Sequence, residues 1–268
     1  MKNVMLFLII GLGKNLSGQT ALPSNQVALN LFNRNTTDAF AFTQNQGALA
    51  GIEKTNIGVY AGRLFMMQEL SDYLLAIGMP TSIGNVGFSY SMFGSKGFRQ
   101  ASMGIAYARR LAQKIDIGVQ FNVNSILLDD LGNASVPGIE VGAIFHLSDK
   151  FQWGLHAKNP GGKKFGIDQH ERFPSVLSMG FGYNMSESFF ISTTLIKEQH
   201  RILNVRSGFQ FNVHKRLQIG IGINSSTGAW WFSSAFRFSK LTVTVSSSMH
   251  TSLGPSPALM LNYELTKK

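Results

Sequence analysis

Hydrophobic and polar residues alternate at every second position over many short stretches of the chain. Isoleucine, valine or phenylalanine occupies each second position from Ile115 to Val123, and Leu217–Asn224 repeats the pattern with glycine or polar residues between. A strand directs successive side chains to opposite faces, so each stretch has one apolar face and one polar or glycine face. Segments of about ten residues with this period, separated by turns, are typical of transmembrane β-barrels. The pattern predicts an all-β, antiparallel transmembrane barrel.

About fourteen strands are predicted, an even number as in bacterial barrels. Their ranges are 56–66, 71–80, 85–94, 100–109, 115–125, 137–147, 151–158, 175–185, 189–197, 203–213, 217–224, 229–238, 240–248 and 256–265.

The predicted connections alternate in length, with short ones such as 110–114 and 214–216 between longer ones such as 127–136 and 159–174. Barrels have short periplasmic turns and longer external loops, and an even strand number places both termini in the periplasm. A soluble β-sandwich, the alternative, has no reason to sort its loops in this way.

The lipid-facing side of the strands is predicted from its apolar side chains, with Tyr and Trp near the strand ends as an interfacial girdle. These residues are Met103, Ile105, Tyr107, Ile139, Val141, Ala143, Phe145, Trp153, Leu155, Leu177, Met179, Phe181, Tyr183, Leu259, Leu261 and Tyr263.

Glycine recurs on the opposite face, where it marks a close approach of other groups. The residues are Gly87, Gly104, Gly118, Gly142, Gly154, Gly180, Gly182, Gly208, Gly220 and Gly222. We interpret this face as the wall of an occupied lumen, with residues 19–54, which are polar and weakly strand-like, as the plug. Alternatively, the glycines only permit the barrel to curve.

Charged residues at inward positions are few, and we expect internal ion pairs or hydrogen bonds to the plug in place of a wide conducting pore. The predicted lumen-facing residues are Asp116, Gln120, Asn122, Glu140, Arg206, Gln210 and Arg237.

Composition restricts the class further. Charged residues make up 14% of the 268 residues, against about 25% in soluble domains. No apolar run reaches the roughly 18 residues of a spanning helix. The chain has no Cys, which excludes disulfides and thiolate chemistry.

The chain is predicted to have three parts. Residues 1–18 are predicted to be a signal peptide, with a short buried strand as the alternative. Residues 19–54 are predicted to form the plug and residues 55–268 the barrel.

The net charge of +10 does not indicate nucleic-acid binding, because the cations lie mostly at predicted turns and form no basic helix. We expect them to contact membrane lipids, including acidic headgroups.

No residue pattern indicates catalysis, a metal or a cofactor. The six histidines lack a local Ser or Asp partner pattern, and Asp129-Asp130 lacks EF-hand spacing. The chain is therefore predicted to be no enzyme, with a Ser–His site on the barrel wall as the alternative. The predicted partner-binding surface is the most charged external loop, with Lys163, Lys164, Asp168, His170, Glu171 and Arg172.

Several segments together carry a family resemblance. They are Asp38–Gly51, Gly58–Tyr60, Gly87–Tyr90, Gly104–Arg109, Gly118–Gln120, Gly154–Pro160, Glu171–Pro174 and Leu253–Pro257. With them the chain resembles FadL-like outer-membrane barrels, in particular the PorV/PorQ-like branch of Bacteroidota. The resemblance implies an outer-membrane barrel of about fourteen strands with its N-terminal segment in the lumen, working with other envelope proteins.

The leading hypothesis from this resemblance is a non-enzymatic partner subunit in type IX secretion or surface cargo handling, bound to a translocon or cargo protein. The alternative is a FadL-like channel for small hydrophobic ligands. Long-chain fatty-acid transporters of the wider family are longer and have larger plugs than this chain.

Overall fold

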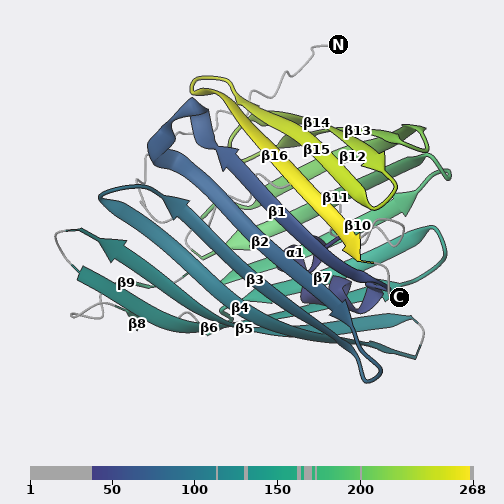
Figure 1. Cartoon of the computed structure of the whole chain (residues 1–268), viewed down its shortest axis with the longest axis horizontal. Coiled ribbons are helices and arrows are strands. Elements are labelled where there is room, and N and C mark those ends of the chain that lie inside the picture. Colours follow the sequence, from purple (N-terminus) through teal and green to yellow (C-terminus); the bar gives the residue numbers. More distant parts are fainter. Residues whose placement is uncertain are drawn as a thin grey trace, which may run out of the picture.

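The chain folds into one closed barrel of fourteen antiparallel strands (Figure 1). The computed structural model describes residues 38–265, except 113, 130, 131, 162, 163, 166–170, 173 and 200. Each barrel strand pairs with its neighbours along the chain, and β1 closes the ring against β16. The predicted barrel is confirmed, and the sandwich alternative is excluded, because a sandwich leaves strand edges that this ring does not have.

The barrel strands follow the predicted ranges closely. They are β1 (Thr55–Arg63), β2 (Ser71–Pro80), β3 (Asn85–Gly94), β4 (Phe98–Leu111), β5 (Ile115–Leu128), β6 (Gly132–His146), β7 (Phe151–Lys158), β10 (Val176–Asn184), β11 (Phe189–Glu198), β12 (Asn204–His214), β13 (Leu217–Asn224), β14 (Ala229–Phe238), β15 (Leu241–His250) and β16 (Gly254–Leu265). The other elements are α1 (Ala41–Gln44), η2 (Gln46–Gly51), η3 (Leu64–Met66), η4 (Gln68–Leu70), β8 (Lys164–Phe165) and β9 (Glu171–Arg172).

The barrel has two distinct ends. Thr55, where the first strand begins, pairs with Leu265, where the last strand ends. We call this the terminal end, and the opposite one the loop end. The two-stranded pair β8–β9 belongs to the connection between β7 and β10 at the loop end.

The predicted contrast in loop length is smaller in the structure, because several strands are longer than expected. The predicted loop 127–136 is mostly strand, with β5 and β6 paired from Leu128↔Gly132 onwards. Ile126 and Val136 bury each other on the inner face, and Ser125 and Ser135 share a hydrogen bond of 2.8 Å. Cross-strand packing of this kind stabilises pairing beyond the apolar stretch.

The first strand ends three residues earlier than predicted. Phe65 and Met66 have φ values of 51° and 61°, a left-handed conformation that no strand continues. The backbone NH of Phe65 donates to Ser256 Oγ at 2.9 Å, so this turn is anchored to β16.

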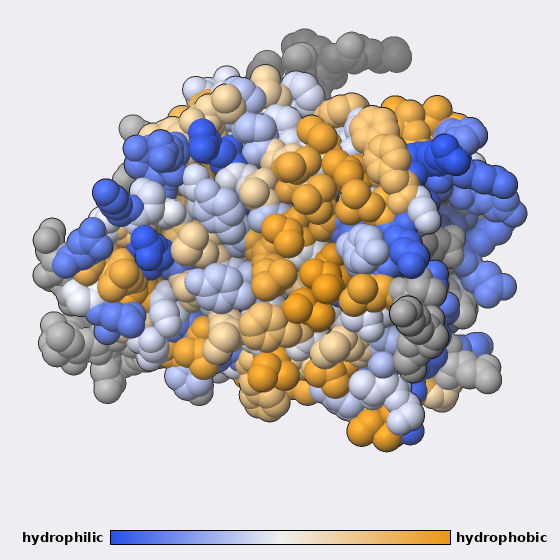
Figure 2. Space-filling view, viewed as in Figure 1, coloured by the Kyte–Doolittle hydropathy of each residue, from blue (hydrophilic) through white to orange (hydrophobic). Residues whose placement is uncertain are grey.

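Large apolar side chains cover the outside of the barrel. Ile105 is 62% and Phe121 64% exposed, and Figure 2 shows hydrophobic residues gathered across the middle of the molecule between two more hydrophilic ends. Near the terminal end, stacked outward rings include Phe145 on Trp153, with centroids 5.0 Å apart. A central apolar belt with aromatic residues toward its margin is the surface of a barrel in a bilayer. None of the described helices is long and apolar enough to cross a membrane.

Candidate functional site

The last part of the predicted plug lies inside the barrel (Figure 1). We call residues 38–52 the plug segment; residues 19–37 and the predicted signal peptide lie outside the described residues. The segment is helical, not weakly strand-like, because two side chains cap its turns. Asp38 Oδ1 accepts hydrogen bonds of 3.0 Å from the backbone NH groups of Phe40 and Ala41. Asn45 Oδ1 accepts one of 3.0 Å from Gly47.

Glycines on the inner face of the barrel form the surface against which the plug segment packs. A Cβ atom at Gly118 would collide with the backbone of Gln46, and one at Gly142 with the side chain of Asn45. At Gly87 it would press on the ring of Phe42. At these three positions glycine therefore allows close approach of the plug segment. Gly104 meets the wall's own polar side chains.

Apolar plug side chains pack against the same wall. The buried cluster joins Phe40, Phe42, Leu49 and Ile52 to Tyr60, Leu74, Ala76, Ala106, Ala108 and Met260. Each large side chain removed from water contributes about 1.5–3 kcal/mol. This burial holds the plug segment against β1–β4 and β16.

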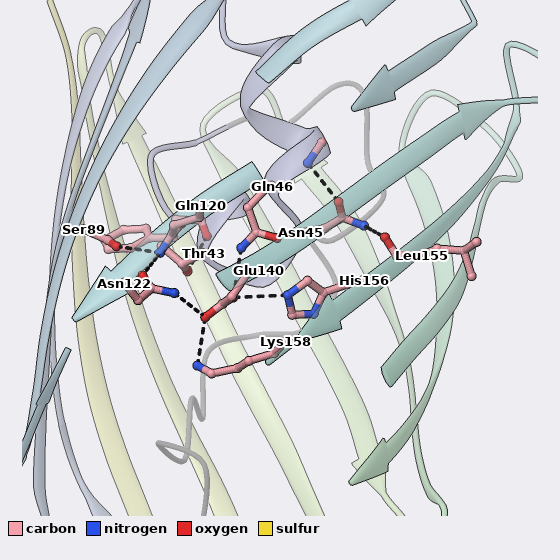
Figure 3. A network of polar contacts seen from close by, with 12 residues as sticks. Thr43, Asn45, Gln46, Ser89, Gln120, Asn122, Glu140, Leu155, His156 and Lys158 are labelled. Carbon is pink, nitrogen blue, oxygen red and sulfur yellow. Dashed lines mark hydrogen bonds and ion pairs between the residues drawn. The ribbon is translucent and has the colours of Figure 1, made fainter. Parts of the chain in front are cut away.

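Glu140 on β6 is the centre of a buried polar network that joins the plug segment to the wall (Figure 3). Its Oε2 accepts from Gln46 Nε2 at 3.0 Å and lies 3.2 Å from His156 Nε2. Its Oε1 accepts from Asn122 Nδ2 at 2.9 Å and forms an ion pair of 3.0 Å with Lys158 Nζ. Four donors thus surround a carboxylate with 4% residue exposure, as a buried charge requires.

The register places this network. Glu140 stands directly opposite Gln120 on β5 and Lys158 on β7. Gln120 Nε2 donates to Asn122 Oδ1 at 2.6 Å and to Ser89 Oγ at 3.2 Å, which extends the network to β3. Strands β3, β5, β6 and β7 and the plug segment therefore share one set of polar contacts, which crosses the face of β4 at Gly104.

Two asparagines bind the plug segment to the barrel through backbone carbonyl groups, one before η2 and one at its end. Asn45 Nδ2 donates to the carbonyls of Ala143 and Leu155 at 3.3 and 3.0 Å. Asn85 Nδ2, from β3, donates to the carbonyls of Leu49 and Ile52, both at 2.7 Å. These contacts fix both ends of η2 to the barrel.

A second charged cluster lies toward the terminal end. Asp116 Oδ1 accepts from Arg110 Nε at 2.7 Å, and Asp116 Oδ2 lies 2.7 Å from His146 Nε2. His146, near the end of the predicted strand 137–147, is the buried last residue of β6. It points inward because it continues the alternation of Ile144 and Gly142 on that strand.

The two histidine clusters show no catalytic arrangement in the described part of the chain. Among the described residues, each ring contacts a carboxylate, and no serine or threonine hydroxyl is hydrogen-bonded to His146 or His156. Over the same residues, no group of three or more His, Asp and Glu side chains could hold a metal ion.

The opposite part of the wall, β11–β16, is lined differently. Trp231 is an inward residue of β14, and its ring lies over the glycines of the two preceding strands, Gly208, Gly220 and Gly222. An aromatic side chain over strand glycines restores the packing that glycine lacks. The cross-strand row through Trp231 continues in small side chains, namely Ser192, Gly208, Gly222, Ser248 and Ser256.

The seven residues predicted to face the lumen all lie on the inner face. Asp116, Gln120, Asn122, Glu140 and Gln210 are buried there, and Arg206 and Arg237 are half-buried. Asp116, Gln120, Asn122 and Glu140 lie on β5 and β6, in the part of the wall that contacts the plug segment. The other three, Arg206, Gln210 and Arg237, lie on β12 and β14.

The predicted partner-binding loop is described only in part. Lys164 and Arg172 face each other in the β8–β9 pair, next to the pair Phe165–Glu171. Lys163, Asp168 and His170 lie outside the described residues.

Several residues of the site were not predicted. Asn45 and Gln46 lie in the segment assigned to the plug without individual roles, and Asn85 was placed only at the start of a strand. Trp231 follows another tryptophan, so its orientation required the flanking alternation: Phe232 and Phe236 face outward and Ser233 and Ala235 inward. That signal was available in the sequence.

Comparison with known proteins identifies the class of fold. No protein-family model matches the sequence, and no curated protein sequence does. Solved structures match over most of their length. The P. putida toluene transporter TodX has a TM-score of 0.67 at 8% identity, over 87% of this chain and 95% of that one. The CymD monoaromatic hydrocarbon channel has 0.65 at 11%, over 85% and 93%.

A Pseudomonas aeruginosa FadL homologue also matches, with a TM-score of 0.57 at 10% identity, over 86% of this chain and 95% of that one. The chain is therefore a FadL-like barrel in fold. Of these neighbours, TodX is a transporter and CymD a channel by name. They give no support to the predicted role in type IX secretion or to placement in the PorV/PorQ-like branch.

Proposed function

We propose that this protein is an outer-membrane channel for small hydrophobic molecules, which corresponds to the alternative hypothesis from the sequence. The observation that carries the proposal is a closed, apolar-belted barrel whose plug segment is fixed to one wall, while glycine and small hydroxyl side chains predominate on the opposite wall beside Arg206, Trp231 and Arg237. The FadL-like fold supports it, although a fold by itself does not define a substrate.

The location follows from the outer surface. The belt around Ile105 and Phe121 would be unstable in water, since exposed apolar patches of this extent favour a hydrocarbon environment. Every strand of the ring has two partners, which satisfies the backbone within the bilayer.

The route we propose runs between the plug segment and the wall of β11–β16. Hydroxyl groups and glycines dominate the inner positions there, as in the rows through Ser233 and Ser246. Away from Arg206 and Arg237, these rows offer few charges to replace the hydration of an ion. Small uncharged solutes pass along them at less cost.

Uptake measurements test this function directly. Cells that produce the protein in their outer membrane are expected to accumulate labelled toluene faster than cells without it. Ser246→Phe places a ring on the inner wall and is expected to slow uptake several-fold. The matched control is Val245→Phe, on the adjacent residue that faces outward and is 52% exposed. Equal uptake with and without the protein would contradict the channel.

A further inference from the structure

Arg206, on the inner face of β12, is a cation without a partner in the described chain. It stands opposite Thr194, which is fully buried on the inner wall. Its Nε is buried and makes no hydrogen bond, and no described carboxylate forms an ion pair with its guanidinium group. A half-buried guanidinium group whose buried Nε has no acceptor favours the binding of an anion.

The chain's own carboxylates do not fill that role in the described structure. Asp116 is held by Arg110 and His146. Glu198, on the neighbouring strand, pairs with Arg201 at 3.3 Å. In the sequence, no acidic residue precedes Asp38, so the N-terminal residues cannot supply one.

An aromatic surface lies beside this cation. A Cβ atom at Gly208 would lie 2.8 Å from Cζ2 of Trp231, and Gly208 is the next inward residue after Arg206. Two residues along a strand span about 7 Å. The ring of Trp231 and the guanidinium group therefore start from neighbouring positions of one wall.

We propose that Arg206 and Trp231 form a binding site for small aromatic carboxylates on the route through the barrel. A guanidinium group matches a carboxylate with two parallel hydrogen bonds. A flat ring stacks in offset geometry on the indole. Small neighbours, Ser192 and Ser248, leave room on the same row.

This site rests on the proposed channel for its access, and binding and transport are measured separately. Calorimetric titration of the detergent-solubilised protein with benzoate is expected to show saturable binding. Arg206→Gln is expected to weaken it at least tenfold, because it removes the charge and the two parallel donors that would hold the carboxylate. Arg206→Lys keeps the charge but not the planar pair of donors, so its benzoate affinity should lie between those of the native protein and Arg206→Gln. Trp231→Leu should weaken benzoate binding, and Trp231→Phe should largely retain it.

The matched control is Arg237→Gln, an inward arginine on β14 that lies six residues beyond Trp231; benzoate affinity should not change. Folding of each variant is checked by the shift in gel mobility on heating. Absence of benzoate binding, or equal affinity in Arg206→Gln and the native protein, would overturn the site. Toluene uptake without benzoate binding would overturn the site and leave the channel standing. Benzoate binding without uptake of either compound would overturn the channel and leave the site.

Discussion

Gln46 Nε2 donates a hydrogen bond of 3.0 Å to Glu140 Oε2, across 94 positions of sequence. This contact joins a short 3₁₀ helix of the plug segment to the middle of the barrel wall. The same carboxylate holds Lys158, His156 and Asn122. Plug and wall are thus parts of one buried network, whose members stabilise one another in a low dielectric.

Glu140→Gln is expected to destabilise the barrel by about 3 kcal/mol, because it leaves the Lys158 ammonium group without its counter-charge. Urea titration of the protein in lipid vesicles measures the change. The control is Glu264→Gln, which removes an exposed ion pair with Lys54 and should cost less than about 1 kcal/mol. Equal losses of unfolding free energy in the two variants would show that the Glu140 network stabilises the barrel no more than an exposed ion pair does.

Gly142→Val is expected to expel the plug segment from its seat, because the new side chain would occupy the space of Asn45. Limited proteolysis should then cut within residues 38–52, which native protein protects. Gly161→Ala serves as the control, since a Cβ there meets nothing within 4 Å. Protection in Gly142→Val equal to that of native protein would refute the close fit.

A disulfide between Asn45→Cys and Gly142→Cys is expected to form without loss of toluene uptake, because the proposed route runs along the other wall. The chain has no Cys of its own, so no other pairing competes. Ser125→Cys with Ser135→Cys, directly opposite on β5 and β6, provides a cross-link away from the plug segment. Uptake that is lost on oxidation and returns with reductant, only in the first pair, would show that the plug segment has to move.

Phe121→Arg is expected to cost about 2–4 kcal/mol in vesicles, the penalty for a cation on the lipid face near the bilayer centre. Phe121 lies midway along β5, between Ile105 and Ile139 on adjacent strands. The control is Ile202→Arg in the connection between β11 and β12, where the side chain is 84% exposed and should tolerate the charge. A small cost at Phe121 would place the membrane elsewhere on the barrel.

Local sequence pattern accounts for most of the barrel. Alternation in Ile115–Asn124 or Leu217–Asn224 depends only on neighbours two residues apart, and the inner and outer faces follow from it. Where alternation fades, prediction failed: within the predicted loop 127–136, residues 127–128 and 132–136 extend β5 and β6, and Ser125 bonds Ser135 beside them. Phe65 and Met66 ended β1 through a backbone conformation that their residue types do not favour.

The sequence by itself determined the strand order, the two faces of each strand, the apolar belt and the inward positions of Asp116, Glu140 and Arg206. Only the tertiary structure decided which inward residues meet. Closure of the barrel sets the register, and register brings Glu140 to Lys158 and Trp231 to Gly208, whereas the position of the plug segment in the lumen brings Gln46 to Gly118. These contacts join residues far apart in the chain, so their energies depend on the closed ring and leave no periodic signal in the sequence.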